Sequence, residues 1–194
     1  MNPQIKILLA SSSRNRRELI KKTGWNVYFD SPEIDEKLIR CSDIHRLPLL
    51  IANAKMEHIL KTRTFDSETI IITSDQVVKY NNEVREKPVD KNEATRFLLS
   101  YSNSKLSTIN AIVITHFPSM KQVSSVDITV IAFNELEDTL VNEITSSETI
   151  LTYAGALDLN NNNLKEKILI ISGSIQSAMG LDVEVCSKLI TSLL

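Results

Sequence analysis

The sequence predicts an α/β fold built on a mixed sheet, and three observations lead to it. Near the N-terminus an apolar strand over Gln4–Ala10 enters a serine-rich loop and then a helix over Asn15–Thr23. The β-branched run Thr69–Thr73 is typical of a strand that is buried on both faces. Two long strands over 108–115 and 123–133, separated by a turn, predict a hairpin. The 194 residues can bury a substantial core as one domain or as two small lobes that share a sheet.

The first half of the chain continues the order of strand, loop and helix. Gly24 ends the first helix, because glycine readily adopts the left-handed backbone that follows many helices. Val27–Phe29 is the next predicted strand. Ser42 or Asp43 then caps a long helix that runs to about Lys61.

The second half of the chain surrounds the hairpin with helices. Asp90 caps a predicted helix that ends near Ser100, and Asn134 caps the helix after the hairpin. The polar run Asn160–Asn163 predicts the tip of a loop. The last predicted elements are a strand over Lys167–Ser172 and a closing helix over Val183–Leu194.

Composition excludes several broad classes of protein. The formal net charge is -2, which argues against a general binder of nucleic-acid polymers. Cys41 and Cys186 lie far apart and form no C-x-x-C pattern, so neither a disulfide framework nor a cysteine metal cluster is indicated. No stretch approaches the roughly 18 apolar residues of a membrane span. We therefore expect a cytoplasmic, soluble protein that binds neither membranes nor nucleic-acid polymers.

The loop over residues 11–17 is the first candidate site, since it gathers three serines and three arginines where the first strand becomes a helix. Amides at a helix N-terminus, serine hydroxyls and arginine forks all donate hydrogen bonds to anions. A polyphosphate would fit this chemistry. An ordinary N-cap by Ser13, with Arg16 and Arg17 as solvated surface charges, explains the same residues and stays open at this point.

Carboxylates and lysines farther along the chain are further candidates. Asp75 follows a buried strand, where an ionised carboxylate must be paired, bound to a metal or functional. Glu36 belongs to an acidic turn, and taken alone this turn is interpreted as a solvated loop. If phosphates bind nearby, the same carboxylates are suitable ligands for Mg²⁺. Lys55 and Lys87, taken alone, are a surface lysine on a helix and a residue of a turn.

The order of these motifs resembles the Maf family of nucleoside triphosphate pyrophosphatases. The resemblance implies a two-lobed, elongated mixed sheet with flanking helices and a central cleft, similar to the inosine triphosphate pyrophosphatases. It also implies hydrolysis of a nucleoside triphosphate to the monophosphate and pyrophosphate. The matching motifs are Leu9-Ala10-Ser11-x-Ser13-x-x-Arg16-Arg17, Pro32-Glu33-Ile34-Asp35-Glu36, Ala52-x-x-Lys55, Ser74-Asp75-Gln76-Val77 and Glu86-Lys87-Pro88.

The resemblance assigns a role to each motif. It implies that Ser11, Arg16 and Arg17 hold the triphosphate, and that Lys55 and Lys87 neutralise charge that develops during cleavage. It also implies that Glu36, helped by Asp35, and Asp75 bind Mg²⁺ or Mn²⁺. Asp75 is equally placed to accept a proton from the attacking water, and the choice between base and ligand stays open.

Base recognition is implied at Asn15 and Gln76. The sequence Ser74-Asp75-Gln76 looks like the subgroup that acts on 7-methyl-GTP, whereas Asn15 stands where that subgroup tends to carry an aromatic residue. The family's glycine-rich segment is replaced over 156–160. Arg14 also replaces the family's proline before the paired arginines. The altered segment over 156–163 and Arg14 lead to the second hypothesis, a nucleotide-binding regulatory protein without catalysis. The sequence leaves the preferred base and the oligomeric state open, a homodimer included.

Overall fold

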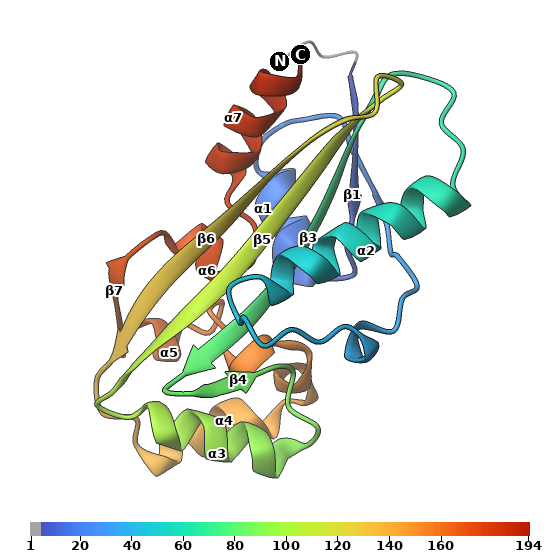
Figure 1. Cartoon of the computed structure of the whole chain (residues 1–194). Helices are drawn as coiled ribbons and strands as arrows, with labels where there is room; N and C mark the ends of the chain where they lie inside the picture. Colours follow the sequence, from blue (N-terminus) through green and yellow to red (C-terminus); the bar gives the residue numbers. More distant parts are fainter. Residues whose placement is uncertain (1–4) are drawn as a thin grey trace. The chain divides into compact units, whose positions relative to one another are not determined.

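A computed structural model describes residues 5–194 and shows one seven-stranded mixed sheet with flanking helices (Figure 1). Gln4, the first residue of the predicted N-terminal strand, lies outside the described residues. The strands are β1 (Lys6–Ala10), β2 (Val27–Asp30), β3 (Thr69–Tyr80), β4 (Glu83–Arg85), β5 (Lys105–Phe117), β6 (Lys121–Phe133) and β7 (Ile168–Ser172). Their order is β2-β1-β3-β5-β6-β7, and β4 pairs with β3. Strand β1 is parallel to β2 and β3, whereas the pairs β3–β4 and β6–β7 are antiparallel, which confirms the predicted mixed α/β class.

Helices connect and cover these strands. They are α1 (Arg14–Lys21), α2 (Leu47–Thr62), α3 (Lys91–Tyr101), α4 (Asp138–Ser146), α5 (Asn162–Lys165), α6 (Ile175–Ala178) and α7 (Val183–Leu193). Short 3₁₀ turns are η1 (Glu36–Leu38), η2 (Glu148–Thr152) and η3 (Ala154–Ala156). Across residues 5–194, no helix has both the length and the apolar character that crossing a membrane requires.

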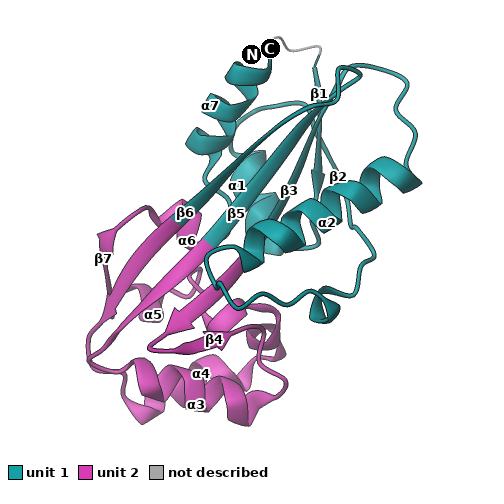
Figure 2. Cartoon of the chain, in the orientation of Figure 1, with its two compact units in different colours: residues 1–75, 110–127, 179–194 teal, residues 76–109, 128–178 magenta. Residues whose placement is uncertain are grey.

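The chain divides into two compact units, coloured separately in Figure 2. Unit 1 takes its described residues from 1–75, 110–127 and 179–194, and unit 2 comprises 76–109 and 128–178. Strands β3, β5 and β6 contribute residues to both units.

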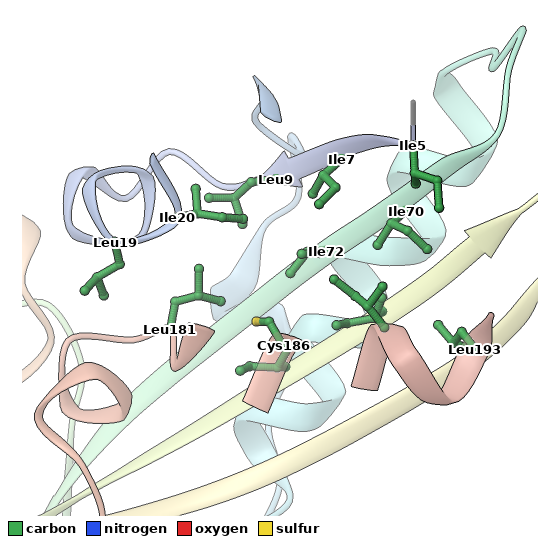
Figure 3. Packing of buried hydrophobic residues seen from close by; sticks show 13 residues of the cluster. Ile5, Ile7, Leu9, Leu19, Ile20, Ile70, Ile72, Leu181, Cys186 and Leu193 are labelled. Carbon is green, nitrogen blue, oxygen red and sulfur yellow. The ribbon is translucent and has the colours of Figure 1, made fainter. Parts of the chain in front are cut away.

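Unit 1 has hydrophobic packing on both faces of its strands. On one face, Leu9 of β1 and Ile72 of β3 belong to a buried cluster with Ile20 of α1 and Cys186 of α7 (Figure 3). The neighbouring residues along the same strands, such as Leu8 and Ile71, belong to a second cluster with Met56 of α2. Side chains alternate across a strand, so helices on both sides of the sheet require the continuous apolar runs seen in the sequence.

Unit 2 has its own core of aromatic rings. Tyr101 of α3 packs against Tyr80 and Phe133, with ring centroids 5.3 and 5.4 Å away. The buried guanidinium of Arg85 lies 4.9 Å from the centroid of the Tyr101 ring and 4.3 Å from that of Tyr80. These contacts hold β3, β4 and α3 together by aromatic and cation–π packing.

Strand β3 corrects the sequence prediction at its most informative point. The sequence suggested that the strand ends at Asp75, but β3 continues to Tyr80 before turning at Asn81, which has a φ of 51°. The acidic side chain therefore lies within a strand rather than after it. Contacts with cationic side chains compensate for the burial of this carboxylate, as described below.

Two helices, α2 and α4, begin later in the chain than predicted. Helix α2 begins at Leu47 rather than after Asp43, because a turn at Asp43 precedes it and Pro48 suits the first helical turn. Helix α4 begins after Glu137 and not after Asn134, since Asn134 N donates a hydrogen bond to the Lys167 carbonyl at 2.7 Å.

Two polar stretches also differ in detail from their predictions. The predicted loop tip at 160–163 contains the start of α5, whose N-cap Asn161 accepts a hydrogen bond from Leu164 N at 3.0 Å. The predicted cap of α3 is confirmed, because the Asp90 carboxylate accepts a hydrogen bond from Glu93 N at 2.8 Å.

Candidate active site

Lys55 lies between two carboxylates in unit 1. Its Nζ is 2.7 Å from Asp75 Oδ1 and 2.8 Å from Glu36 Oε1. The side chains of Lys55 and Asp75 are only 8% and 9% exposed, whereas that of Glu36 is 42% exposed. Helix α2, strand β3 and turn η1 thus bring three of the predicted site residues to one point. The lysine ammonium and the two carboxylates form a compact charged group, of which Glu36 is the most exposed member.

Burial and neighbouring charges act in opposite directions on this group. Burial raises the pKa of Asp75, and the positive charges of Lys55 and Arg16 oppose that rise. Burial likewise lowers the pKa of Arg16, while the negative charges of Asp75 and Glu36 counteract it. The buried carboxylate therefore depends on its cationic neighbours to stay ionised.

The Ser/Arg loop, residues 11–17, connects β1 to α1. Ser13 occupies the N-cap position of α1 without a capping bond from its side chain; instead, its N–H donates to Ser11 Oγ at 3.2 Å. Arg17 is partly buried, donates from Nε to the Ser11 carbonyl at 2.8 Å and from Nη2 to Ser31 Oγ at 3.3 Å. Arg17 thus connects the loop to the segment that follows β2, and its guanidinium also lies 5.3 Å from the centroid of the Phe29 ring.

Arg16 links this loop to the charged group. Its side chain is buried and donates from Nη1 to Ser11 Oγ at 3.4 Å and to the Ser74 carbonyl at 2.9 Å. Its Nε donates to the Gly180 carbonyl at 2.9 Å. Ser74 directly precedes Asp75, so one guanidinium ties the start of α1 to the strand that carries the central acid. The arginine is not a solvated surface charge.

Sequence reasoning overlooked a buried polar network behind Asp75. Ser74 Oγ donates to the Gly180 carbonyl at 2.9 Å, and the amide of Asn110 lies beside both residues. Ser74, Asn110 and Gly180 are all buried. The position of Asn110 within the apolar run of β5 could have predicted this network. A buried polar side chain requires hydrogen-bond partners, just as the buried acid in β3 does.

The remaining predicted residues are Asn15, Gln76 and Lys87. Asn15 is buried in the first turn of α1 in unit 1. Gln76 and Lys87 belong to unit 2. There Gln76 Nε2 donates to the carbonyls of Ala178 and Ser177 at 2.7 and 3.2 Å. Lys87 is exposed in the segment that follows β4.

The carboxylates of Glu36 and Asp75 are suitable ligands for a divalent cation such as Mg²⁺, if a substrate supplies further oxygen ligands. Glu36 and Asp75 already converge on one positive charge, the ammonium of Lys55. Within residues 5–194, no group of three or more His, Cys, Asp or Glu side chains is arranged to hold a metal ion. Mg²⁺ commonly needs only one or two protein carboxylates when phosphate oxygens and waters complete its shell. The two acids therefore fit such an ion.

The fold and this group of residues define a mixed α/β protein with a charged site beside a phosphate-compatible loop. The chain belongs to the Maf family, whose model, described as Maf-like protein, matches residues 6–193.

Curated relatives match the chain over most of its length. A Dictyostelium discoideum protein named 7-methyl-GTP pyrophosphatase is 28% identical over 192 residues, which cover 96% of each chain. A Fusobacterium nucleatum protein named dTTP/UTP pyrophosphatase is 27% identical and is matched over 91% of this chain and 90% of its own. A solved Mycobacterium abscessus structure, titled nucleoside-triphosphatase / dITP/XTP pyrophosphatase, matches 97% of this chain and 98% of its own with 14% identity and a TM-score of 0.41.

Proposed function

We propose that this protein hydrolyses a nucleoside triphosphate to the nucleoside monophosphate and pyrophosphate. The observation that carries the proposal is the buried Lys55, held between Asp75 and Glu36 and tied through Arg16 to the Ser/Arg loop. Membership of the Maf family and the names of the relatives support the same reaction.

The reaction requires charge neutralisation more than covalent chemistry. A water attacks the α-phosphorus, and the bond from that phosphorus to the oxygen bridging to the β-phosphorus breaks, so that pyrophosphate leaves. The Ser11 hydroxyl, the Arg17 guanidinium and the α1 amides offer donors to phosphate oxygens. Lys55 supplies positive charge as negative charge builds on the leaving group. The role of Lys87 in the same task rests on the resemblance alone.

Glu36 and Asp75 would hold a divalent ion, Mg²⁺ or Mn²⁺, together with substrate oxygens. Such an ion, when bound, would neutralise phosphate charge and help to orient the triphosphate. Asp75 accepts the proton of the attacking water or serves as a ligand, and both roles need the carboxylate to be ionised. Lys55 favours this ionised state by its position 2.7 Å away.

The first substrate to test is 7-methyl-GTP, with dTTP and UTP as the alternatives. The sequence Ser74-Asp75-Gln76 and the Dictyostelium relative favour the methylated guanine nucleotide. Other relatives are named for dTTP and UTP. Asn15 and Gln76 are the residues that we propose for base recognition, which is a separate task from holding the phosphates.

The decisive experiment incubates the protein with canonical and modified nucleoside triphosphates and separates monophosphate, diphosphate, pyrophosphate and phosphate. Each reaction is run with Mg²⁺, with Mn²⁺ and with excess EDTA. We expect monophosphate and pyrophosphate in equal amounts, with EDTA stopping the reaction. Asp75→Asn should abolish turnover in a folded protein. The control Asp66→Asn changes a carboxylate of unit 1 that is 92% exposed and should keep full activity.

Two results would count against the proposal. Release of diphosphate and phosphate would indicate cleavage at the γ-phosphorus. Nucleotide binding detected as a rise in Tm, with no product from any substrate, would support the nucleotide-binding regulator instead.

A further inference from the structure

Asn110 is a fully buried amide in the middle of β5, within the part of that strand that belongs to unit 1. Hydrogen bonding fixes the orientation of its side chain, because the group that faces three oxygens must be the donor. In this orientation, Nδ2 lies 3.1 Å from the Asp75 carbonyl, 3.1 Å from Ser74 Oγ and 2.9 Å from the Gly180 carbonyl. One side chain thus joins two strands and the segment before α7.

The carbonyl of Gly180 is the common acceptor of this network. Arg16 Nε, Ser74 Oγ and Asn110 Nδ2 each lie 2.9 Å from it. Three donors around one buried oxygen form a network whose members contribute to stability jointly rather than independently. The network therefore contacts the backbone of Ser74 and Asp75. Lys55 contacts the side-chain carboxylate of Asp75.

We propose that Asn110 is a positioning residue for Asp75: its amide fixes the main chain of the central acid through the Asp75 carbonyl and the shared Gly180 oxygen. This inference rests on the proposed function, because positioning matters to turnover only if Asp75 serves in catalysis. A displacement of about 1 Å in a reacting group can cost roughly 100-fold in rate. Asn110 touches neither substrate nor metal in this proposal.

The test compares Asn110→Leu with a matched control on the same strand. Leu has a similar branched outline but no donor. The control is Thr115→Val, because Thr115 is also buried in the unit 1 part of β5 and loses a single hydrogen bond, from Oγ1 to Gln122 Oε1 at 3.0 Å. Steady-state kinetics on the best substrate is measured for both variants. Amide hydrogen exchange at residues 74–76 is measured without substrate.

We expect Asn110→Leu to lower kcat by about 10- to 100-fold while KM changes by less than about 3-fold. Exchange at residues 74–76 should rise by about 10-fold. Thr115→Val should leave kcat within about 2-fold and local exchange unchanged. Asn110→Thr, which retains one donor, should recover part of kcat, and it replaces the Leu variant if that one does not fold.

An Asn110 variant that keeps full kcat overturns the proposal. Equal losses of kcat in Asn110→Leu and Thr115→Val do so as well, since they would show a general effect of stability. If the wild-type protein turns over no nucleoside triphosphate, the proposed function fails by itself. The exchange measurement then decides whether Asn110 holds the Asp75 backbone, and unchanged exchange refutes it.

Discussion

Lys55 Nζ lies 2.7 Å from Asp75 Oδ1, although the two residues are 20 positions apart in the sequence and belong to a helix and a strand. Both side chains are buried, so neither charge is well solvated by water. Each charge therefore stabilises the other at a place where either alone would be costly. The pair gives the site a local order that does not depend on a bound nucleotide.

Lys55→Met is expected to destabilise the protein, because it leaves Asp75 buried without its closest cation. The free energy of unfolding should fall by about 3 kcal/mol, measured by urea denaturation at pH 7. Lys61→Met is the control on the same helix, since Lys61 forms an exposed pair with Glu57 at 3.6 Å. It should change the free energy by less than about 0.5 kcal/mol. Equal effects of the two variants would contradict the buried pair.

Arg16 and Arg17 should respond differently to replacement by lysine. Arg16→Lys removes a fork that bonds Ser11, Ser74 and Gly180 at once, and a single ammonium cannot reproduce its geometry. We expect this variant to lose about 2 kcal/mol of stability and most of kcat. Arg17→Lys, in the more open position, should mainly raise KM. Kinetics and denaturation of both variants check this split, and identical behaviour would refute it.

Gly180→Ala tests the close packing against Arg16. Gly180 has a φ of +100°, and an added Cβ would lie 2.9 Å from Arg16 Nε. Gly24→Ala is the control, because its φ is +72° and nothing lies within 4 Å of the added atom. The control measures backbone strain of about 1–2 kcal/mol. Gly180→Ala should cost at least about 1 kcal/mol more in denaturant unfolding, and a smaller cost than the control would exclude the contact.

Tyr101 should make the stability of the protein sensitive to alkali. Burial raises its pKa from 10.0 to about 12, although the positive charge of Arg85 opposes the rise. Its hydroxyl donates to the Gly155 carbonyl at 3.1 Å, and this bond favours the neutral phenol. A raised pKa means that the stabilisation is complete below pH 10 and is lost as the pH rises toward 12. The difference corresponds to about 3 kcal/mol.

Two measurements between about pH 9 and pH 12 test this effect, since tyrosine phenols ionise in this range. Absorbance at the tyrosinate wavelength follows ionisation, and urea unfolding gives the stability at each pH. In Tyr101→Phe the part of the loss that is due to this phenol should disappear. A tyrosine titration in which all four phenols ionise near pH 10 would show that Tyr101 is not protected.

The sequence alone determined most of the secondary structure of unit 1, because local patterns dominate there. Continuous apolar runs such as Thr69–Thr73 require burial on both faces, and period-2 alternation places Leu8 and Leu9 in different clusters. The predicted start of a helix was less accurate where a hydrogen bond to a residue far along the chain determines it. Asn134 shows the reason: its backbone is bonded to Lys167, and no local signal reveals that bond.

The sequence also selected the residues of the candidate site, since ordered motifs pointed to Ser11, Glu36, Lys55 and Asp75 without any coordinates. Only the tertiary structure decided how these residues are arranged. It placed Asp75 inside a strand, buried Arg16 and brought the Asn110 amide to 3.1 Å from the Asp75 carbonyl. Hydrogen bonds between residues far apart in the chain depend on distances of a few tenths of an ångström, and a linear pattern of residue types does not contain those distances.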